Sequence, residues 1–397
     1  MTRNRERLAA PDVLRVACIF LVAWYHFWQQ SWLDPGFRIG KYYVNLQQII
    51  RHGYMMVDLM LLLSGFLLAL PCARQMVSGA GNTRLRAGDF YVRRCWRIVP
   101  SYSLAVVAVL VFYAIPQGGY PSVRAMLKDL VTHLTFTHTF FVDTYIGTNL
   151  PVVLWTLAVE VQFYILWPIV AMLYTRKPAW TCGALIVFAC AVRGWVYIRP
   201  DTTMYINQLP CMLDLYACGM AAALIFARLN ASGKPSAGAR RWIAALGMLA
   251  CFIGMIWVMY RQPVGNYEAI RQGQLTWRLP LALLGGGFLV CGCLAPSGLS
   301  KAVGNPLTRF LAAISYNFYI WHQFLACRLK DWHIPAYEAD MPNQAGEQPW
   351  QTRYTLMCFA AALVLAAAVT FLFERPIQKW GLKHASDRTD GCTTGEP

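Results

Sequence analysis

Charged residues are scarce in this chain, and acidic ones are the scarcest. Of its 397 residues only 14% are charged and 19 are Asp or Glu, whereas 57% are hydrophobic. Soluble domains average about 25% charged residues. The shortage of charge excludes an ordinary soluble domain. The chain is also rich in aromatic residues, with 15 Trp and 20 Tyr, two residue types that are enriched at membrane interfaces.

Signatures of several other protein classes are missing as well. The chain shows no internal repeat and no low-complexity tract. Most of its 13 cysteines, such as Cys18 and Cys182, lie inside apolar runs, where a thiol behaves as a small hydrophobe. Cys291 and Cys293 stand two apart in an expected helix, a spacing that suits neither a disulfide nor a zinc site. We therefore expect no disulfide framework and no metal.

The net charge of +16 does not indicate a nucleic-acid partner. The arginines form no basic domain with interleaved aromatic residues. They lie in short loops between apolar runs, where positive residues set the orientation of a membrane protein. A cleavable signal peptide is not expected either, because the run after "MTRNRER" is long enough to span and lacks a small-residue cleavage site.

Ten apolar runs have the length of a membrane-spanning helix, about 17–25 residues. They predict an all-α polytopic membrane protein with one transmembrane domain over residues 1–380 and a short, disordered cytoplasmic tail over 381–397. The spans are expected at 12–31, 54–73, 98–115, 151–174, 179–197, 208–229, 241–260, 275–294, 307–328 and 353–375.

The distribution of Lys and Arg predicts that both termini are cytoplasmic. With the N-terminus inside, most basic residues fall in cytoplasmic segments, above all in the arginine-rich loop 74–97. Two outer segments are then long, 116–150 and 329–352. The first contains "MLKDLVTHLTFTHTFF", which either lies along the membrane surface or dips into it. His133 and His138 within it are weak candidates for metal ligands, because no carboxylate is expected beside them.

Ionisable residues inside the spans are expensive and therefore candidates for function. They are Asp12, Arg15, His26, Asp58, Glu160, Asp214 and His322. The predicted topology places the five from His26 onward in the outer halves of their helices. Arg15 and His26 share one face of the first span, roughly 16 Å apart along its axis. Such a face suits a long ligand with its anionic end at Arg15 and its reactive end at His26.

Structural alternatives remain for each of these residues. Arg15 also suits a local pair with Asp12, its charge reaching the cytoplasmic interface. A single histidine in a span is often a hydrogen-bonded packing residue, and Asp58 or Glu160 would also serve to bridge helices. The basic stretch "FYVRRCWRIVP" has two interpretations too: a positive-inside loop, or phosphate capture by the fixed donors of arginine.

The motifs together resemble the membrane-bound acyltransferase 3 family, nearly end to end and in order. An arginine, ten residues and a histidine resemble that family's first-helix motif. Two departures are Met60-Leu61 in place of paired aromatics and Thr156 in place of serine; neither removes an ionisable group. The remaining blocks are "VDLMLLLSGFLL", "YVRRCWRIVPSY", "LTFTHTFF", "LWTLAVEVQFYILWPI", "MLDLYACGM", "ISYNFYIWH" and "FLFERPI".

The resemblance implies transfer of an acyl group, usually acetyl from cytoplasmic acetyl-CoA, to a sugar hydroxyl at the outer face of the bacterial inner (plasma) membrane. His26 would be the catalytic histidine, and Glu160 and His322 occupy other marked polar positions. The phosphates of coenzyme A would be held by Arg15, Arg93, Arg94 and Arg97. We expect no extracytoplasmic domain of the kind that some members carry after the last helix, so transfer is expected to finish within the membrane domain.

Geometry and resemblance suggest one mechanism. His26 takes the proton of the acceptor hydroxyl, and Asp58, Glu160 or Asp214 orients its ring. His322 or backbone N–H groups steady the oxyanion. The acceptor stays open between lipopolysaccharide or exopolysaccharide, peptidoglycan, another glycolipid and a small metabolite. Two other functions compete: a transporter or flippase for a glycan or glycolipid, which also needs intramembrane acids, and a sensor without turnover.

Overall fold

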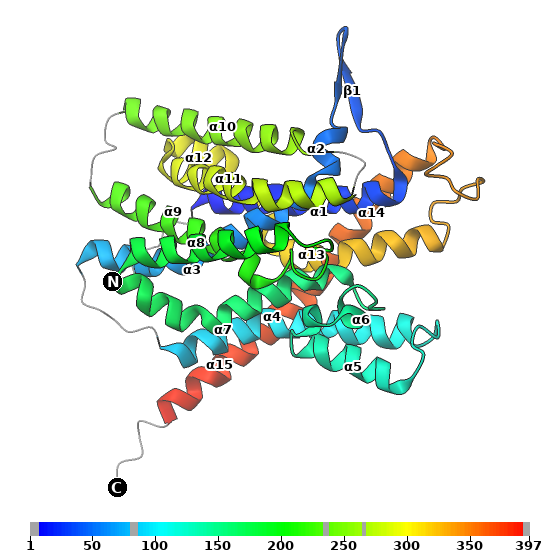
Figure 1. The fold of residues 1–397 in the computed structure, drawn as a ribbon, viewed down its shortest axis with the longest axis horizontal. Helices are drawn as coiled ribbons and strands as arrows, with labels where there is room; N and C mark the ends of the chain where they lie inside the picture. Colours follow the sequence, from blue (N-terminus) through cyan, green and yellow to red (C-terminus); the bar gives the residue numbers. More distant parts are fainter. Residues whose placement is uncertain (1–7, 80–85, 233–237, 264–266, 392–397) are drawn as a thin grey trace. The chain divides into compact units, whose positions relative to one another are not determined.

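The computed structural model describes residues 8–79, 86–232, 238–263 and 267–391, and its ribbon is helical almost throughout (Figure 1). The chain groups into two compact units that interleave in sequence. Unit 1 comprises Met1–Thr83, Ile169–Ala313 and Ala336–Thr355, and unit 2 comprises Arg84–Pro168, Ile314–Pro335 and Leu356–Pro397. The single domain expected over residues 1–380 stays a prediction.

Unit 1 holds the first helix and most of the middle of the chain. It also takes the last part of α7, the start of α13 and the start of α14. Its own elements are α1 Ala9–Ser31, β1 Gly36–Ile39, β2 Tyr42–Asn45, α2 Gln47–Arg51, the short 3-10 helix η1 Gly53–Met55, α3 Met56–Ser78, α8 Pro178–Tyr197, η5 Leu209–Cys211, α9 Leu213–Ala231, α10 Gly238–Tyr260, α11 Tyr267–Leu294 and α12 Ser297–Val303.

Unit 2 holds the basic helix α4 and most of three further long helices. Its elements are α4 Ala87–Val109, the π-helical turn η2 Leu110–Ala114, α5 Val123–Leu134, η3 His138–Phe140, α6 Val142–Tyr145, η4 Val152–Leu154, most of α7 Trp155–Arg176, of α13 Pro306–Asp331 and of α14 Trp350–Ala368, the π-helical turn η6 Val369–Glu374, and α15 Arg375–Gly391.

Within the described residues, nine helices are long and apolar enough to cross a membrane. They coincide with nine of the ten predicted spans, which confirms the all-α polytopic class. The tenth prediction, 307–328, forms α13, a helix of 26 residues. α13 falls outside the apolar set because polar groups such as Arg309, Asn317 and Gln323 interrupt it.

Glycine residues bring α3 and α9 into close contact in unit 1. A Cβ atom built on Gly65 would lie 2.4 Å from the carbonyl oxygen of Tyr216, and one on Gly219 would lie 2.1 Å from that of Leu62. No side chain fits at such distances. Small residues are what allow backbones to approach this closely in lipid. This crossing positions Asp58 on α3 and Asp214 on α9.

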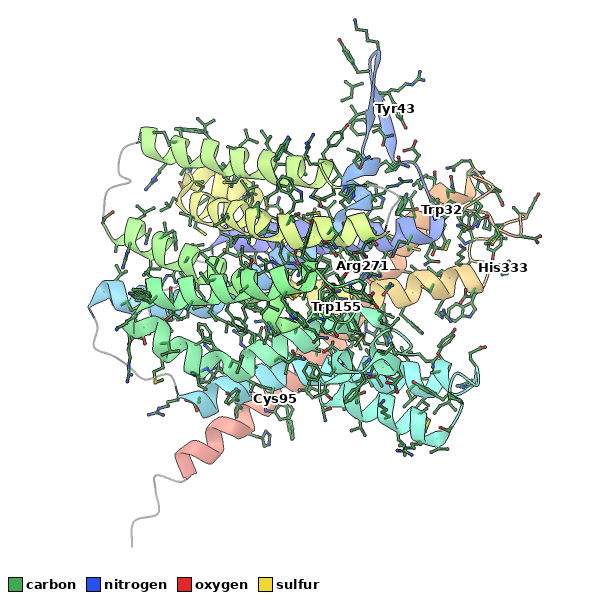
Figure 2. The ribbon with its side chains drawn as sticks, viewed as in Figure 1. Trp32, Tyr43, Cys95, Trp155, Arg271 and His333 are labelled. Carbon is green, nitrogen blue, oxygen red and sulfur yellow. The ribbon has the colours of Figure 1, made fainter. Side chains whose placement is uncertain are left out.

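A β-hairpin that the sequence analysis did not anticipate follows α1. β1 and β2 pair antiparallel, with Phe37 opposite Val44 and Ile39 opposite Tyr42. Trp32 caps α1 in the left-handed region, with φ of 53° and its N–H donating to the Trp28 carbonyl. Figure 1 shows the hairpin standing away from the helices of unit 1, and Figure 2 labels Tyr43 on it.

Helix α5 in unit 2 buries polar side chains and exposes a row of apolar ones. The exposed apolar residues Val123, Leu127, Val131 and Leu134 recur at helical intervals, and Arg124 and Lys128 are exposed beside them. Asp129 and His133, in contrast, are buried. A helix in water shows the opposite arrangement, so this pattern favours contact of the segment 116–150 with lipid, as both predicted placements require.

The C-terminal prediction needs a correction. The sequence analysis expected a disordered tail from residue 381, but α15 continues as a helix to Gly391. Gly381 packs directly on Trp96 of α4, and Trp380 meets Trp96 edge to face with ring centroids 5.8 Å apart. These aromatic contacts hold the start of the expected tail to unit 2. Residues 392–397 lie outside the described part of the chain.

The glycine crossing generates a stability prediction. Gly65→Ala should lower the free energy of unfolding by about 1–3 kcal/mol, because the new methyl group forces α3 and α9 apart. The measurement is the thermal unfolding midpoint in detergent by intrinsic fluorescence. Gly183→Ala in α8 is the matched control, since a Cβ there meets no atom within 4 Å. The control should leave the midpoint unchanged or raise it. Equal effects of both changes would contradict the tight crossing.

Candidate functional site

Helix α1 in unit 1 carries the predicted donor-site face. Arg15 and His26 are both half-buried on it. His26 Nδ1 lies 2.8 Å from Gln29 Oε1, and Gln29 Nε2 donates to the Tyr25 hydroxyl at 2.9 Å. Because Oε1 only accepts, Nδ1 carries the proton and Nε2 is the basic nitrogen of the neutral ring. The i, i+3 spacing of His26 and Gln29 was visible in the sequence, but Gln29 was not singled out.

Asp58 on α3 is held by an arginine from α11. Arg278 Nε donates to Asp58 Oδ2 at 3.0 Å, and its Nη1 donates to the Ile206 carbonyl at 2.8 Å. Arg278 is 1% exposed and Asp58 is 6% exposed. A buried charge requires a partner, and each residue supplies the other's.

A second buried pair lies in the same unit. Arg193 on α8 donates to both carboxylate oxygens of Asp214, at 2.6 and 2.7 Å, and to the Cys211 carbonyl at 2.9 Å. The bidentate geometry is the strong form of this contact. Asp58 interacts electrostatically with both members of this pair. Two arginines and two aspartates therefore balance one another inside unit 1.

These two arginines were missing from the sequence-based inventory of intramembrane charges. Arg193 and Arg278 lie within the predicted spans 179–197 and 275–294. A simple count of opposite charges inside the spans would have found them. Their presence gives Asp58 and Asp214 a structural partner each.

The basic motif forms the first half of α4 in unit 2. The guanidinium of Arg94 stacks over the Tyr164 ring at 4.9 Å and over the Phe90 ring at 5.7 Å. Arg93 and Arg97 are exposed. Within the described part of the chain, neither has a hydrogen bond or an ion pair. These cations are therefore open to an anionic ligand.

Glu160 lies near these cations on α7. It accepts a short hydrogen bond from the hydroxyl of Tyr164, one helical turn later. Tyr164 in turn interacts electrostatically with Arg94 and Arg97. Glu160 and the arginines of α4 thus belong to one polar region of unit 2, bridged by a tyrosine that the sequence analysis did not consider.

His322 on α13 is 1% exposed and fixed from one side. Its Nδ1–H donates to the Tyr319 carbonyl at 2.6 Å, and its ring stacks on Phe318 at 6.2 Å and 11°. The Thr156 hydroxyl donates to the Tyr319 hydroxyl at 2.9 Å. Thr156 therefore supplies the hydroxyl that its serine counterpart would provide, so this departure from the motif leaves the contact in place.

Two of the motifs meet through Asn317 and Glu374. Asn317 Nδ2 donates to Glu374 Oε2 at 2.5 Å and to the Thr370 hydroxyl at 2.9 Å. Glu374 interacts electrostatically with Arg97. Glu374 ends the predicted span 353–375, yet it was not counted among the intramembrane ionisable residues.

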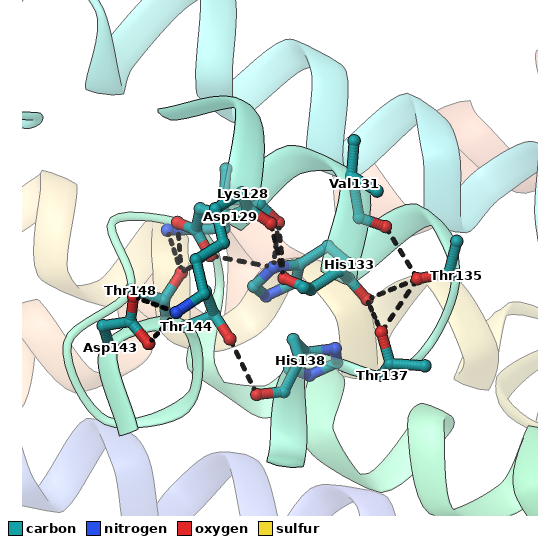
Figure 3. A network of polar contacts seen from close by, with 12 residues as sticks. Lys128, Asp129, Val131, His133, Thr135, Thr137, His138, Asp143, Thr144 and Thr148 are labelled. Atoms are coloured by element: carbon teal, nitrogen blue, oxygen red, sulfur yellow. Dashed lines mark hydrogen bonds and ion pairs between the residues drawn. The ribbon is translucent and has the colours of Figure 1, made fainter. Parts of the chain in front are cut away.

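The segment 116–150 contains a buried network of its own (Figure 3). His133 Nδ1 donates to the Asp129 main-chain carbonyl at 2.9 Å and lies 3.0 Å from Asp129 Oδ1, and the Asp129 carboxylate accepts from Tyr120 and Thr148. The expectation that no carboxylate stands beside these histidines is therefore wrong. The rings of His133 and His138 stack at 3.9 Å and 8°. Burial, and secondarily the His133 ring, lower the pKa of His138 to about 2, so its ring is neutral at pH 7.

Within the described residues no group of three His, Cys, Asp or Glu side chains is arranged to hold a metal ion. The acid–base groups that the motifs predicted thus fall into two sets. His26 and Asp58 belong to unit 1, and Glu160 and His322 belong to unit 2.

Comparison with known proteins identifies the family. The model of an acyltransferase domain matches residues 8–375. Peptidoglycan O-acetyltransferase OatA of Listeria monocytogenes is 24% identical over 95% of this chain and 57% of its own length. YrhL of Bacillus subtilis, provisionally named a peptidoglycan O-acetyltransferase, is 24% identical over 98% of this chain and 57% of its own. A Staphylococcus aureus protein, provisionally named an O-acetyltransferase, is 23% identical over 75% of this chain.

The chain spans 57% of the length of the first two relatives, and no solved structure matches it. The family match, in contrast, covers nearly the whole chain, including every residue that the sequence analysis predicted for the site. The chain therefore belongs to the membrane-bound acyltransferase 3 family, and its described residues include nine helices long and apolar enough to cross a membrane.

Proposed function

We propose that this chain transfers an acetyl group from cytoplasmic acetyl-CoA to a hydroxyl of a cell-envelope carbohydrate, with peptidoglycan the favoured acceptor and the bacterial inner membrane the location. The names of the relatives from Listeria and Bacillus support the acetyl group and the peptidoglycan. The observation that carries the proposal is the His26 ring on a membrane-spanning helix, with its Nδ1 proton engaged by Gln29 and Nε2 therefore basic.

His26 is the proposed general base. Its Nε2 takes the proton of the acceptor hydroxyl as the oxygen attacks the thioester carbonyl. The C–S bond then breaks, and the coenzyme A thiolate leaves and takes up a proton. Gln29 preserves the reactive tautomer, the task that an orienting carboxylate performs in a catalytic triad. We propose that His322 or a backbone N–H steadies the oxyanion, and that Glu160, bonded to Tyr164, is a further polar group of the reaction.

The donor phosphates require cations that no protein carboxylate already neutralises. Arg193 and Arg278 are each engaged by an aspartate, which leaves them poorly suited to this role. Arg93 and Arg97 are exposed and have no ion pair within the described residues. We propose that they bind the phosphates together with Arg94, and that Arg15 on α1 also serves the donor.

The Asp58–Arg278 pair suggests a revised role for Asp58. As a predicted partner of His26 it would orient the ring directly. Its short contact to Arg278 instead supports a counter-ion role that holds α3 against α11 within unit 1. Asp214 has the same relation to Arg193.

The test of the function is incubation of the purified protein in nanodiscs with radiolabelled acetyl-CoA and soluble peptidoglycan fragments. Labelled acetyl on the fragments, or slow hydrolysis of the donor without them, supports the proposal. Binding of the donor without turnover would support the sensor alternative, and no interaction with the donor would support the transporter.

His26→Ala should lower acetyl transfer by about 10²–10⁴-fold, the usual contribution of a general base, while the protein still inserts and elutes as a single species. Turnover is measured as free thiol released per minute. Gln29→Ala should cause a smaller loss of turnover, because the His26 ring then populates both tautomers but the imidazole base is still present. Near-normal turnover of His26→Ala would contradict the mechanism.

Arg97→Gln should raise the KM for acetyl-CoA by roughly ten-fold or more and change kcat little, because a charge-assisted hydrogen bond to phosphate is worth about 1.5–3 kcal/mol. Acetyl-dephospho-CoA, which lacks one phosphate, shows whether that phosphate is the partner of Arg97. The ratio of its KM to that of acetyl-CoA should be smaller in the variant than in the unmodified protein. Arg176→Gln, an exposed arginine at the end of α7, is the matched control. Equal KM values for Arg97→Gln and Arg176→Gln would refute the assignment.

Asp58→Asn should destabilise the protein by about 3–5 kcal/mol, because it leaves a buried arginine unpaired. The double variant Asp58→Asn with Arg278→Gln should recover most of the loss, since a neutral amide can still donate to the Ile206 carbonyl. Thermal unfolding and turnover are measured on both. Recovered stability without recovered turnover would instead support the direct catalytic role of Asp58.

A further inference from the structure

The β-hairpin Gly36–Asn45 has two chemically different faces. Side chains alternate along a strand, and cross-strand partners share a face. The register pairs Phe37 with Val44 and Ile39 with Tyr42, so these four side chains form one face that is wholly apolar apart from a single hydroxyl. Arg38 pairs with Tyr43 and Gly36 with Asn45, which makes the other face polar.

The apolar face is exposed rather than packed on the helices. Phe37 is 47% exposed, Ile39 is 61% exposed and Tyr42 is 67% exposed. An isolated two-stranded hairpin is marginally stable in water, and its apolar face needs a covering layer, such as a packed helix, for the hairpin to be stable. Within the described residues, unit 1 offers these side chains no such layer.

The position of the hairpin indicates what covers that face. It follows directly after α1, a helix of membrane-spanning length, with the linker Trp32–Pro35 between them. Figure 1 shows the hairpin running across the direction of α1 and α10 and away from both. Because α1 crosses the membrane, a ribbon across its axis at its end runs along the membrane surface.

The charge of the hairpin also favours contact of its apolar face with a lipid bilayer. Arg38 and Lys41 are its charged residues, and residues 36–45 contain no acid. Lys41 reaches back over the Tyr42 ring at 5.4 Å. Aromatic rings combined with Lys and Arg are typical of the headgroup level of a bilayer. A second copy of the hairpin would bring like charges together, whereas lipid phosphates would neutralise them.

We propose that the hairpin is a lipid-surface anchor. The face of Phe37, Ile39, Tyr42 and Val44 inserts among the outer ends of the acyl chains, and Arg38 and Lys41 contact the headgroup phosphates. The hairpin thereby fixes the level of the end of α1 in the bilayer. The proposal concerns membrane attachment and does not require acyl transfer.

Adjacent tyrosines on opposite faces provide a matched test. Tyr42→p-benzoylphenylalanine and Tyr43→p-benzoylphenylalanine both replace exposed aromatic side chains, and the Tyr43 ring also lies over Gly36 of the opposite strand, so elution as a single species is checked for both variants. The full-length variants are reconstituted in nanodiscs of phosphatidylethanolamine and phosphatidylglycerol and then irradiated. Mass spectrometry counts lipid adducts. Position 42 should form roughly five-fold more than position 43, as expected for a one-sided amphipathic ribbon.

Each other result would overturn the proposal. Equal lipid labelling at the two positions would mean that the hairpin does not lie flat on the membrane. Adducts to a second copy at position 42 would make the face a dimer interface. The same irradiation in native membranes tests for a protein partner, and a dominant protein adduct there would replace the lipid. The absence of any adduct at position 42 would show that the face stays in solution.

Discussion

A charge placed in a lipid bilayer must find an opposite charge or a hydrogen-bond partner, and this requirement explains much of unit 1. Water is not available there to compensate for a missing partner. Arg278 meets Asp58, and Arg193 meets Asp214. Each arginine also binds a carbonyl of the connection between α8 and α9, at Ile206 or Cys211. The pairs thus hold an irregular stretch of backbone as well as four helices.

The same requirement separates structural cations from those suited to a ligand. Among the described residues, the arginines of unit 1 that lie deep in the helices are neutralised by aspartate. The exposed Arg93 and Arg97 of α4 have no ion pair among these residues, and the half-buried Arg94 stacks over the Tyr164 ring. Charge that the protein does not balance is what an anionic donor would balance. The buried His133–Asp129 contact follows the rule too, in a segment whose apolar side chains point outward.

Sequence patterns predicted the elements well and their partnerships poorly. Apolar run length is a local property, so nine of the predicted spans are confirmed as helices of membrane-spanning length. α13 escaped the apolar criterion because it places Asn317 and His322 among apolar residues. The Arg278–Asp58 contact joins residues 220 positions apart, and the local sequence around one residue does not predict the other as its partner. The hairpin was missed because its strands have only four residues each.

The candidate site likewise contains residues that the local sequence identifies and residues whose role depends on contacts in the fold. Arg15, His26 and the arginines of α4 stood out because charge in an apolar run is a local signal. Gln29, Tyr164 and Asn317 are ordinary polar residues at helical positions, and their roles emerge only from the side chains beside them. Glu374 belongs to one of the motifs but lies near the end of a predicted span, where charged residues are common and do not indicate function.

The Gln29 contact links the acid–base character of His26 to the integrity of a helix end. Both residues lie in the last two turns of α1, which closes at the left-handed Trp32. Helix ends fray more readily than helix centres. Each opening of the last turn would release the ring to exchange tautomers, so the fraction of time during which Nε2 is the basic atom depends on local backbone order. In the proposed mechanism, proton transfer at His26 would therefore be coupled to a motion that amide hydrogen exchange at Gln29 and Trp32 reports directly.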